Sequence, residues 1–184
     1  MKRLFDFLAS LAGLVLLAPL FLVIALAIAL DSPGPVFFSQ ARVGRGLVVF
    51  KMQKFRSMIE DAARQGPYFT TTNDTRITRV GRWLRKTSID ELPQLWNVLV
   101  GDMSIVGPRP DVPAQQQLYV AEEWSLRHVV RPGITGPSQA SSRSEATFEE
   151  RKDLDLRYAQ NHSFKGDLVI IARTFVQVLG KGGN

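Results

Sequence analysis

The longest hydrophobic pattern of the chain lies at its N-terminal end. Between Asp6 and Asp31 runs an uncharged stretch of 24 residues. As one helix it would extend about 36 Å at 1.5 Å per residue, enough to cross a hydrocarbon core of about 30 Å. Pro19 lies near the centre of the stretch, where a proline removes a backbone hydrogen bond and favours a kink.

Three interpretations of this stretch compete. A signal peptide would use Lys2 and Arg3 as its basic end, but its apolar region usually spans about 7–15 residues, fewer than here. A straight transmembrane helix and a helix bent at Pro19 that returns to the same side are the other two. Positive residues mark the cytoplasmic side of a membrane segment, and here they stand on both sides, which favours the bent helix. The downstream positive residues are Arg42, Arg45, Lys51, Lys54 and Arg56. The residues alone leave all three open.

Beyond the hydrophobic stretch the predicted elements are shorter. A proline- and glycine-containing cluster at residues 31–35 ends the helix. Residues 35–40 and 47–55 then predict two short strands joined through a glycine-containing turn, which is an antiparallel hairpin. Residues 58–75 have the composition of an exposed loop.

Two amphipathic helices are predicted in the rest of the chain. Residues 75–86 place arginines every third position beside an apolar stripe that includes Trp83. Residues 166–180 predict a second helix, which Gly180 should end. Its apolar face suits either the protein core or a membrane surface.

Composition removes several kinds of site. The chain has no cysteine and only two histidines, His128 and His162, far apart in sequence, so a thiolate or histidine zinc centre is poorly supported. The net charge of +6 indicates an anionic partner. Residues 41–88 hold eleven Lys or Arg against three Asp or Glu. A basic amphipathic helix beside a membrane segment favours anionic lipid headgroups over nucleic acid as that partner.

Two adjacent carboxylates, Asp90 and Glu91, stand before a helical pattern that contains Leu92, Leu95 and Leu99. Glu91 three residues after Ser88 matches a capping box, and Asp90 could itself be the N-cap. Both carboxylates would then be structural.

The same geometry also permits catalysis. The mouth of a helix attracts phosphate, and an aspartate there could attack phosphorus to form an acyl phosphate. Such chemistry needs a divalent cation and arginines to offset the negative charge. Arg85, Lys86 and Arg109 stand nearby in the sequence, and Arg131 lies in a second proline-glycine turn. Position alone leaves capping and catalysis both open.

Three stretches in order resemble one family: KFRSM, SIDELPQLWNVLVGDMSIVGPRP and VRPGITGPSQASSR, behind an apolar segment with a central proline. The chain is similar, from about residue 2 to 180, to the monotopic bacterial sugar transferases, which are polyprenyl-phosphate phosphoglycosyl transferases. The resemblance implies transfer of a sugar-1-phosphate from a UDP-sugar to undecaprenyl phosphate, with release of UMP.

The resemblance also implies roles for individual residues. Asp90 matches the nucleophile that forms a phosphosugar intermediate, with Mg²⁺ beside it. Glu91 matches its partner, for proton handling or for positioning of the lipid phosphate. The phosphate-binding residue upstream of this pair matches Arg85, and the remaining basic positions of the family's motifs match Lys54, Arg109, Arg131 and Arg143.

Two departures from the family concern its membrane segment and its pocket. The family breaks its re-entrant helix at a Ser-Pro pair, whereas this chain has Ala18 before Pro19, so the angle of the bend is open. Pro137 replaces a larger apolar residue near the expected sugar or nucleotide pocket. The identity of the sugar is therefore not predicted.

Taken together, these features predict a mostly helical α+β fold with a small antiparallel hairpin sheet. With the resemblance added, we expect residues 1–30 to form a re-entrant membrane helix broken at Pro19, and residues 31–184 to form the catalytic domain. We expect a monotopic protein on the cytoplasmic face of the bacterial inner membrane, held by amphipathic helices on anionic phospholipid, with no nucleic-acid partner. The oligomeric state stays open, with a homo-oligomer among the alternatives. Rival hypotheses are a membrane-anchored binding module and a glycosyltransferase that moves the sugar alone.

Overall fold

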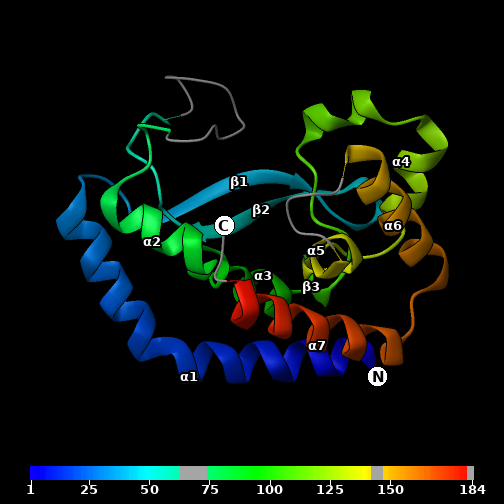
Figure 1. Cartoon of the computed structure of the whole chain (residues 1–184), viewed down its shortest axis with the longest axis horizontal. Helices are drawn as coiled ribbons and strands as arrows, with labels where there is room; N and C mark the ends of the chain where they lie inside the picture. Colours follow the sequence, from blue (N-terminus) through cyan, green and yellow to red (C-terminus); the bar gives the residue numbers. More distant parts are fainter. Residues whose placement is uncertain (63–73, 142–146, 182–184) are drawn as a thin grey trace.

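The computed structural model describes residues 1–62, 74–141 and 147–181 (Figure 1). Its α-helices are α1 (Lys2–Asp31), α2 (Arg79–Thr87), α3 (Gln94–Val100), α4 (Ala121–Arg127), α5 (Pro137–Ser141), α6 (Phe148–Asn161) and α7 (Phe164–Lys181). Short 3₁₀ helices are η1 (Arg45–Leu47), η3 (Ile89–Glu91) and η4 (Pro113–Leu118). The strands are β1 (Phe37–Val43), β2 (Val49–Phe55), β3 (Ser104–Val106) and β4 (Gly133–Thr135).

The strands form two small sheets. β1 and β2 pair antiparallel, from Phe37 opposite Phe55 to Val43 opposite Val49, which confirms the predicted hairpin. β3 and β4 pair in parallel, and this pair was not predicted because three-residue strands carry too little alternation to be read. The predicted class, mostly helical with a small antiparallel sheet, is confirmed, with the parallel pair as an addition.

Helix α1 changes direction part-way along its length (Figure 1). Pro19 lies inside this helix, and a proline in a helix interior lacks the N–H that would bond the preceding turn. A proline-induced kink therefore accounts for the bend, as the sequence predicted.

Both ends of α1 are attached to the same body. At the N-terminal end, the buried Asp6 accepts hydrogen bonds from Ser104 Oγ at 2.9 Å and from the backbone N–H of Ile105 at 3.0 Å. At the C-terminal end, Asp31 Oδ2 accepts from the backbone N–H of Val80 at 2.9 Å, in the first turn of α2. Ile28 is buried near this end in a cluster with other apolar side chains. The two ends of α1 therefore cannot separate without breaking buried contacts.

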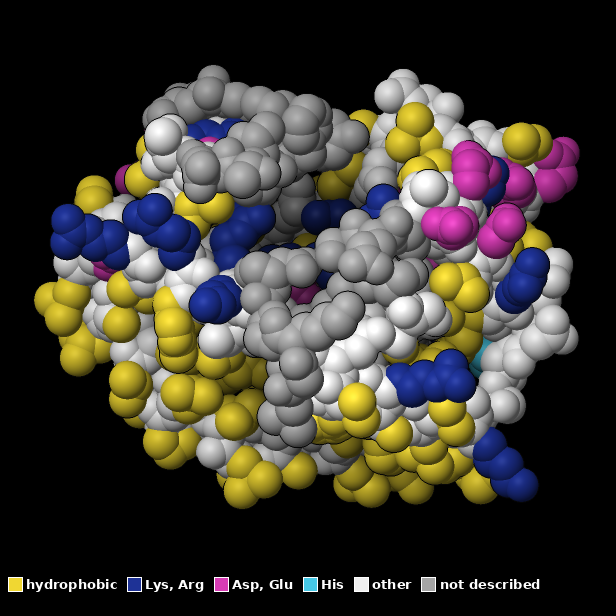
Figure 2. Space-filling model, in the orientation of Figure 1, with side chains coloured by type: hydrophobic (Ala, Val, Ile, Leu, Met, Phe, Trp, Pro, Cys, Tyr) yellow, Lys and Arg dark blue, Asp and Glu magenta, His cyan; other side chains and the backbone are white. Residues whose placement is uncertain are grey.

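The outer faces of α1 and α7 remain uncovered. Leu8, Val15 and Leu16 on α1 and Phe175 and Val176 on α7 are more than half exposed. Figure 2 shows hydrophobic side chains gathered along the lower edge of the molecule, where α1 and α7 lie in Figure 1. Helix α1 is long and apolar enough to cross a membrane. An apolar face of this extent marks an interaction surface rather than ordinary solvent-exposed surface.

Helix α7 continues to Lys181, past Gly180, so the predicted end of this helix was wrong.

Helix α3 is fixed to strand β2 by one amide. Asn97 Oδ1 accepts from the backbone N–H of Gln53 at 2.9 Å, and its Nδ2 donates to the carbonyl of Lys51 at 2.9 Å. Beneath them Met52 and Val98 are buried in one apolar cluster. This contact holds the middle of α3 against the middle of β2, and η3 precedes α3 directly.

We expect Gly81→Ala to displace α2. A Cβ at this position would lie 2.0 Å from the carbonyl oxygen of Ser57, which is backbone and cannot move aside. Overpacking of this kind costs about 1–3 kcal/mol, which denaturant unfolding in detergent would measure. The control is Gly166→Ala in α7, whose Cβ would meet only the Ser163 hydroxyl, at 3.2 Å. Equal unfolding midpoints for both variants would contradict the close approach of α2.

Candidate functional site

Asp90 and Glu91 lie in η3, the single turn between α2 and α3. The turn begins at Ser88, whose φ of 58° is left-handed and ends α2. Neither η3 nor α3 has a side-chain hydrogen bond at its cap, and the residue before α3 is Pro93. The capping interpretation of the two carboxylates is therefore wrong. The Glu91 side chain binds Lys54 and Arg109, and the Asp90 side chain has no hydrogen bond within the described ranges.

Glu91 is held by two cations from distant parts of the chain. Its Oε1 accepts from Lys54 Nζ at 2.7 Å and from Arg109 Nη2 at 2.7 Å. Burial alone raises the pKa of Glu91, but the charges and hydrogen bonds of Arg109 and Lys54 outweigh it and hold this pKa well below its usual range. Glu91 is therefore ionised, and its charge fixes the two cations in place.

Asp90 has a different environment. Its side chain is buried at 8% exposure, and within the described ranges no donor hydrogen-bonds to it. Burial raises the pKa of Asp90, and the charge of Glu91 acts in the same direction, while Lys54, Arg85 and Arg109 lower it. Hydrogen bonds would stabilise the carboxylate and weaken it as a nucleophile, so their absence suits attack on an electrophile.

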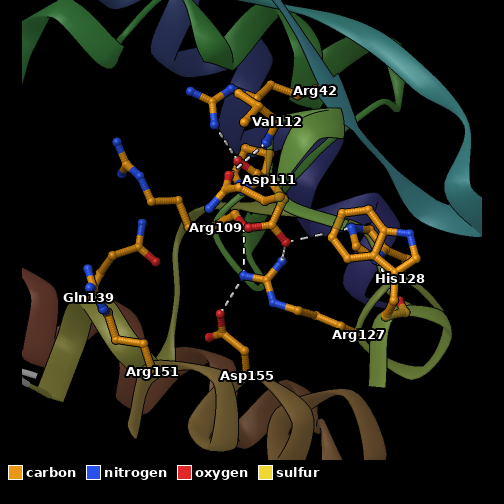
Figure 3. A network of polar contacts seen from close by, with 12 residues as sticks. Arg42, Arg109, Asp111, Val112, Arg127, His128, Gln139, Arg151 and Asp155 are labelled. Atoms are coloured by element: carbon orange, nitrogen blue, oxygen red, sulfur yellow. Dashed lines mark hydrogen bonds and ion pairs between the residues drawn. The ribbon is translucent and has the colours of Figure 1, made fainter. Parts of the chain in front are cut away.

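Arg109 stands on a loop in which four consecutive carbonyls, from Pro108 to Asp111, accept hydrogen bonds. Figure 3 shows Arg42 and Arg127 beside this loop. The carbonyl of Arg109 accepts from Arg127 Nη2 at 2.9 Å, and that of Pro110 accepts from Arg42 Nη1 at 2.8 Å. The flanking carbonyls, those of Pro108 and Asp111, accept from the backbone N–H groups of Gly133 and Val43, each at 2.9 Å. Four bonds in a row leave the loop little freedom. The side chain of Arg109, half exposed, is thus aimed at Glu91 by a rigid backbone.

The buried guanidinium of Arg127 lies at the centre of this support (Figure 3). It pairs with Asp111 and, at 2.6 Å, with Asp155 on α6. Burial and the neighbouring Asp155 raise the pKa of Asp111 to about 6, against the lowering effect of Arg127. Arg127 and Asp155 were not predicted as site residues, and Arg42 was expected only as one of the positive charges after the apolar stretch. Their separation along the chain shows no local pattern, so no sequence signal could have grouped them.

The structure brings together most of the predicted site residues. Lys54 and Arg109 contact Glu91 directly, and Arg85 interacts electrostatically with Asp90. Arg131 is placed elsewhere: its Nε donates to the carbonyl of Gly101 at 2.8 Å, and it lines a cavity beside the N-terminus of α1. Arg143 lies outside the described residues.

The donor set at Asp90 is compatible with Mg²⁺. Magnesium in phosphoryl-transfer sites is typically held by one or two carboxylates and completed by water and substrate phosphates. In the part of the chain that the structure describes, no three metal-binding side chains cluster, so a fully protein-made cage is not found there. Asp90 can serve as the single carboxylate ligand, because no donor in the described ranges occupies its oxygens, whereas Glu91 already holds two cations.

Comparisons with known proteins match nearly the whole chain to one family. The profile of a family described as "Bacterial sugar transferase" matches residues 1–181. The protein named undecaprenyl-phosphate glucose phosphotransferase from Komagataeibacter xylinus is 49% identical, over 94% of this chain and 35% of that protein. The exopolysaccharide production protein PSS from Rhizobium leguminosarum bv. phaseoli is 45% identical, over 99% of this chain and 96% of that protein.

A third relative carries a different sugar in its name. The UDP-N-acetylgalactosamine-undecaprenyl-phosphate N-acetylgalactosaminephosphotransferase of Aeromonas hydrophila is 41% identical, over 97% of this chain and 43% of that protein. The chain thus spans less than half of the first and third relatives and nearly all of the second.

Proposed function

Because the chain belongs to the bacterial sugar transferase family, we propose that it transfers a sugar-1-phosphate from a UDP-sugar to undecaprenyl phosphate and releases UMP. The names of the relatives from K. xylinus and A. hydrophila support this choice of donor and acceptor. The observation that carries the proposal is the pair in η3. Asp90 is buried without a hydrogen bond from the described residues, next to a Glu91 that holds Lys54 and Arg109.

In the first step, an Asp90 carboxylate oxygen attacks the β-phosphorus of the UDP-sugar. The new bond is an acyl phosphate, and UMP leaves with the electron pair of the broken phosphoanhydride bond. A phosphate oxygen of the polyprenyl acceptor then attacks the same phosphorus, and Asp90 leaves as a free carboxylate. Lys54, Arg85 and Arg109 offset the negative charge of the phosphates around Asp90. A Mg²⁺ ion bound by Asp90 and substrate phosphate would supply further charge neutralisation.

Glu91 acts in this proposal by positioning. A carboxyl group whose pKa is held far below its usual range is a weak base at neutral pH. Glu91 instead keeps Lys54 and Arg109 together at the phosphate-binding side of the site. Of the two roles that the resemblance left for Glu91, positioning is the one that these contacts support.

The attachment of α1 supports a re-entrant membrane placement. A helix that crossed the bilayer would carry its two ends on opposite sides, yet Asp6 and Asp31 bond to the same body. We propose that the bend of α1 enters the cytoplasmic leaflet and that the exposed apolar faces of α1 and α7 contact lipid. The protein would then be monotopic on the cytoplasmic face of the inner membrane, with positive residues on both sides of the apolar stretch of α1.

A UMP-release assay tests this function. The purified chain in detergent is incubated with undecaprenyl phosphate and a panel of UDP-sugars that begins with UDP-glucose and UDP-N-acetylgalactosamine, with and without Mg²⁺. We expect UMP release from at least one donor, and only when Mg²⁺ is present. Release of UDP would instead assign the chain to glycosyltransferases that move the sugar alone. Release of neither, from a chain shown to be folded, would favour a binding module.

The pH dependence of the reaction provides a separate prediction. Asp90 must be ionised to attack, and its pKa is raised, so the acid limb of kcat/KM should lie above about pH 4, where an ordinary aspartate titrates. The charge of Lys54 lowers this pKa, so Lys54→Met should move the limb to higher pH. The pH profile of UMP release measures the shift. Lys51→Met, an exposed position on the same strand, is the control, and a limb that stays in place in Lys54→Met would contradict the coupling.

A further inference from the structure

A basic cavity lies apart from the Asp90 site. It has a volume of about 320 Å³ and is lined by the N-terminus of α1, the turn between β1 and β2, strand β3, the segment before β4, and Tyr158 and His162 at the end of α6. Four cationic side chains line it: Lys2, Arg3, Arg45 and Arg131. Its size lies at the lower end of the range of about 300–1,000 Å³ for small-molecule sites.

The carboxylates near this cavity are already engaged. Asp6, the acidic residue of its lining, accepts from Ser104 Oγ and from the backbone N–H of Ile105. Lys2 is paired at 2.6 Å with the buried Asp167 on α7. Among the described lining residues the one carboxylate, Asp6, bonds to Ser104 and Ile105 and forms no ion pair with an arginine, so the four cations of the lining leave the cavity with an excess of positive charge.

The arginines of the cavity retain free donors. Arg3 uses its two terminal nitrogens on the carbonyls of Val98 and Leu99, at the end of α3. Arg131 uses only Nε, on Gly101, and the side chain of Arg45 has no hydrogen bond within the described ranges. Burial lowers the pKa of Arg131, and the neighbouring charges of Arg3 and Arg45 lower it further, against the smaller raising effect of Asp6. An anion between these guanidinium groups would relieve that repulsion and fill the free donors.

Exposed apolar side chains border the same turn. Leu47 is 44% exposed and Val48 is 67% exposed, both beside Arg45, and Val129, which lines the cavity, is 49% exposed. The backbone N–H of Gly46 donates to the carbonyl of His128 at 2.8 Å, which fixes the turn against the segment of Val129. Basic donors bordered by exposed apolar side chains suit the boundary between lipid headgroups and acyl chains, where a free phosphate would leave the apolar rim uncovered.

We propose that this cavity binds the phosphate of an anionic phospholipid headgroup, with Arg45 and Arg131 as donors and with Leu47, Val48 and Val129 facing the acyl chains. The site rests on the membrane placement proposed above and is independent of the chemistry at Asp90. The residues that line it include none of Lys54, Arg85, Glu91 and Arg109. It would hold the N-terminal half of α1 at the membrane surface.

Short-chain lipids in detergent test the site on the full chain. Calorimetry compares dihexanoylphosphatidylglycerol, dihexanoylphosphatidylcholine and inorganic phosphate. We expect the wild type to bind the anionic lipid at least tenfold more tightly than either other ligand. Arg45→Gln should weaken that binding by about tenfold, because it removes a charge-assisted hydrogen bond. Lys51→Gln makes the same change of net charge at an exposed position outside the cavity and should bind as the wild type does.

Three outcomes would overturn the proposal. They are equal binding of the two lipids, an equal loss in Arg45→Gln and Lys51→Gln, and binding of inorganic phosphate as tight as that of the anionic lipid. The last outcome would identify a site for a soluble phosphate. The membrane placement is tested separately by an alkaline carbonate wash of membranes, which should leave the wild type bound. If the wash detaches the protein from the membranes, the membrane placement is wrong. The UMP assay would still test the chemistry at Asp90.

Discussion

We expect Asp90→Asn to lower UMP release by at least about 10³-fold. The amide is close in size to the carboxylate but cannot form the acyl phosphate, so both transfer steps lose their covalent route. The amide also removes the negative charge that a Mg²⁺ ion would use at this position. Because the Asp90 side chain takes part in no hydrogen bond within the described ranges, the substitution should leave the fold intact. Initial rates of UMP release with saturating donor measure the effect.

The matched control is Asp153→Asn. Asp153 is exposed on α6 and makes no hydrogen bond or ion pair in the described part of the chain, so this variant makes the same chemical change away from the site. Its rate should equal that of the wild type. An Asp90→Asn variant that keeps near-normal turnover would remove Asp90 as the nucleophile, and the account of the site would then have to be abandoned.

The second large effect is expected at Arg127. Arg127→Met leaves Asp111 and Asp155 buried without their shared cation. Removal of one partner from a buried ion pair costs about 3–5 kcal/mol, and we expect a loss of this size in the free energy of unfolding. Activity should fall as well, because the carbonyl of Arg109 loses the bond that fixes its loop. Urea unfolding in detergent measures the stability. Arg127→Lys keeps the charge but not the forked geometry, so its free energy of unfolding should lie between those of the wild type and Arg127→Met.

Acidification should partly repair Arg127→Met. The pKa of Asp111 is already raised to about 6 in the wild type, and Arg127 lowers it, so the variant should raise it further. A carboxyl group with a raised pKa in the folded state binds protons there before it does in the unfolded chain, so stability increases as the pH falls. The stability deficit of Arg127→Met should therefore shrink between about pH 7 and pH 5. A deficit that grows over this range would contradict the buried-carboxylate explanation.

Local patterns were sufficient for the elements that have a clear period. The hairpin of β1 and β2, the basic helix α2 and the bent helix α1 all follow from alternation, from helical spacing or from a proline inside an apolar run. The parallel pairing of β3 with β4 joins two three-residue segments far apart in the chain, and no local period marks it. Such a pair is set by tertiary contacts, which a single sequence does not display.

The candidate site shows the same division. Asp90, Glu91 and Arg85 lie in one short stretch, and the family resemblance pointed to them and to Lys54 and Arg109. The direction of each side chain was not accessible from the sequence. The spacing of Ser88 and Glu91 matches a capping box, whereas in the structure the Glu91 carboxylate binds Lys54 and Arg109. Arg131 stands in a family motif, yet its backbone directs it to Gly101 and to the basic cavity beside the N-terminus of α1.

The most direct test of the central claim is to look for the covalent intermediate itself. The wild type is incubated with its UDP-sugar and Mg²⁺ without the lipid acceptor, then acid-quenched and examined as an intact protein by mass spectrometry. We predict release of up to one UMP per chain and a mass increase equal to one sugar-phosphate group, mapped by proteolysis to Asp90 and absent from Asp90→Asn. A chain that turns over with acceptor present but never carries this mass, or carries it on another residue, would contradict the account.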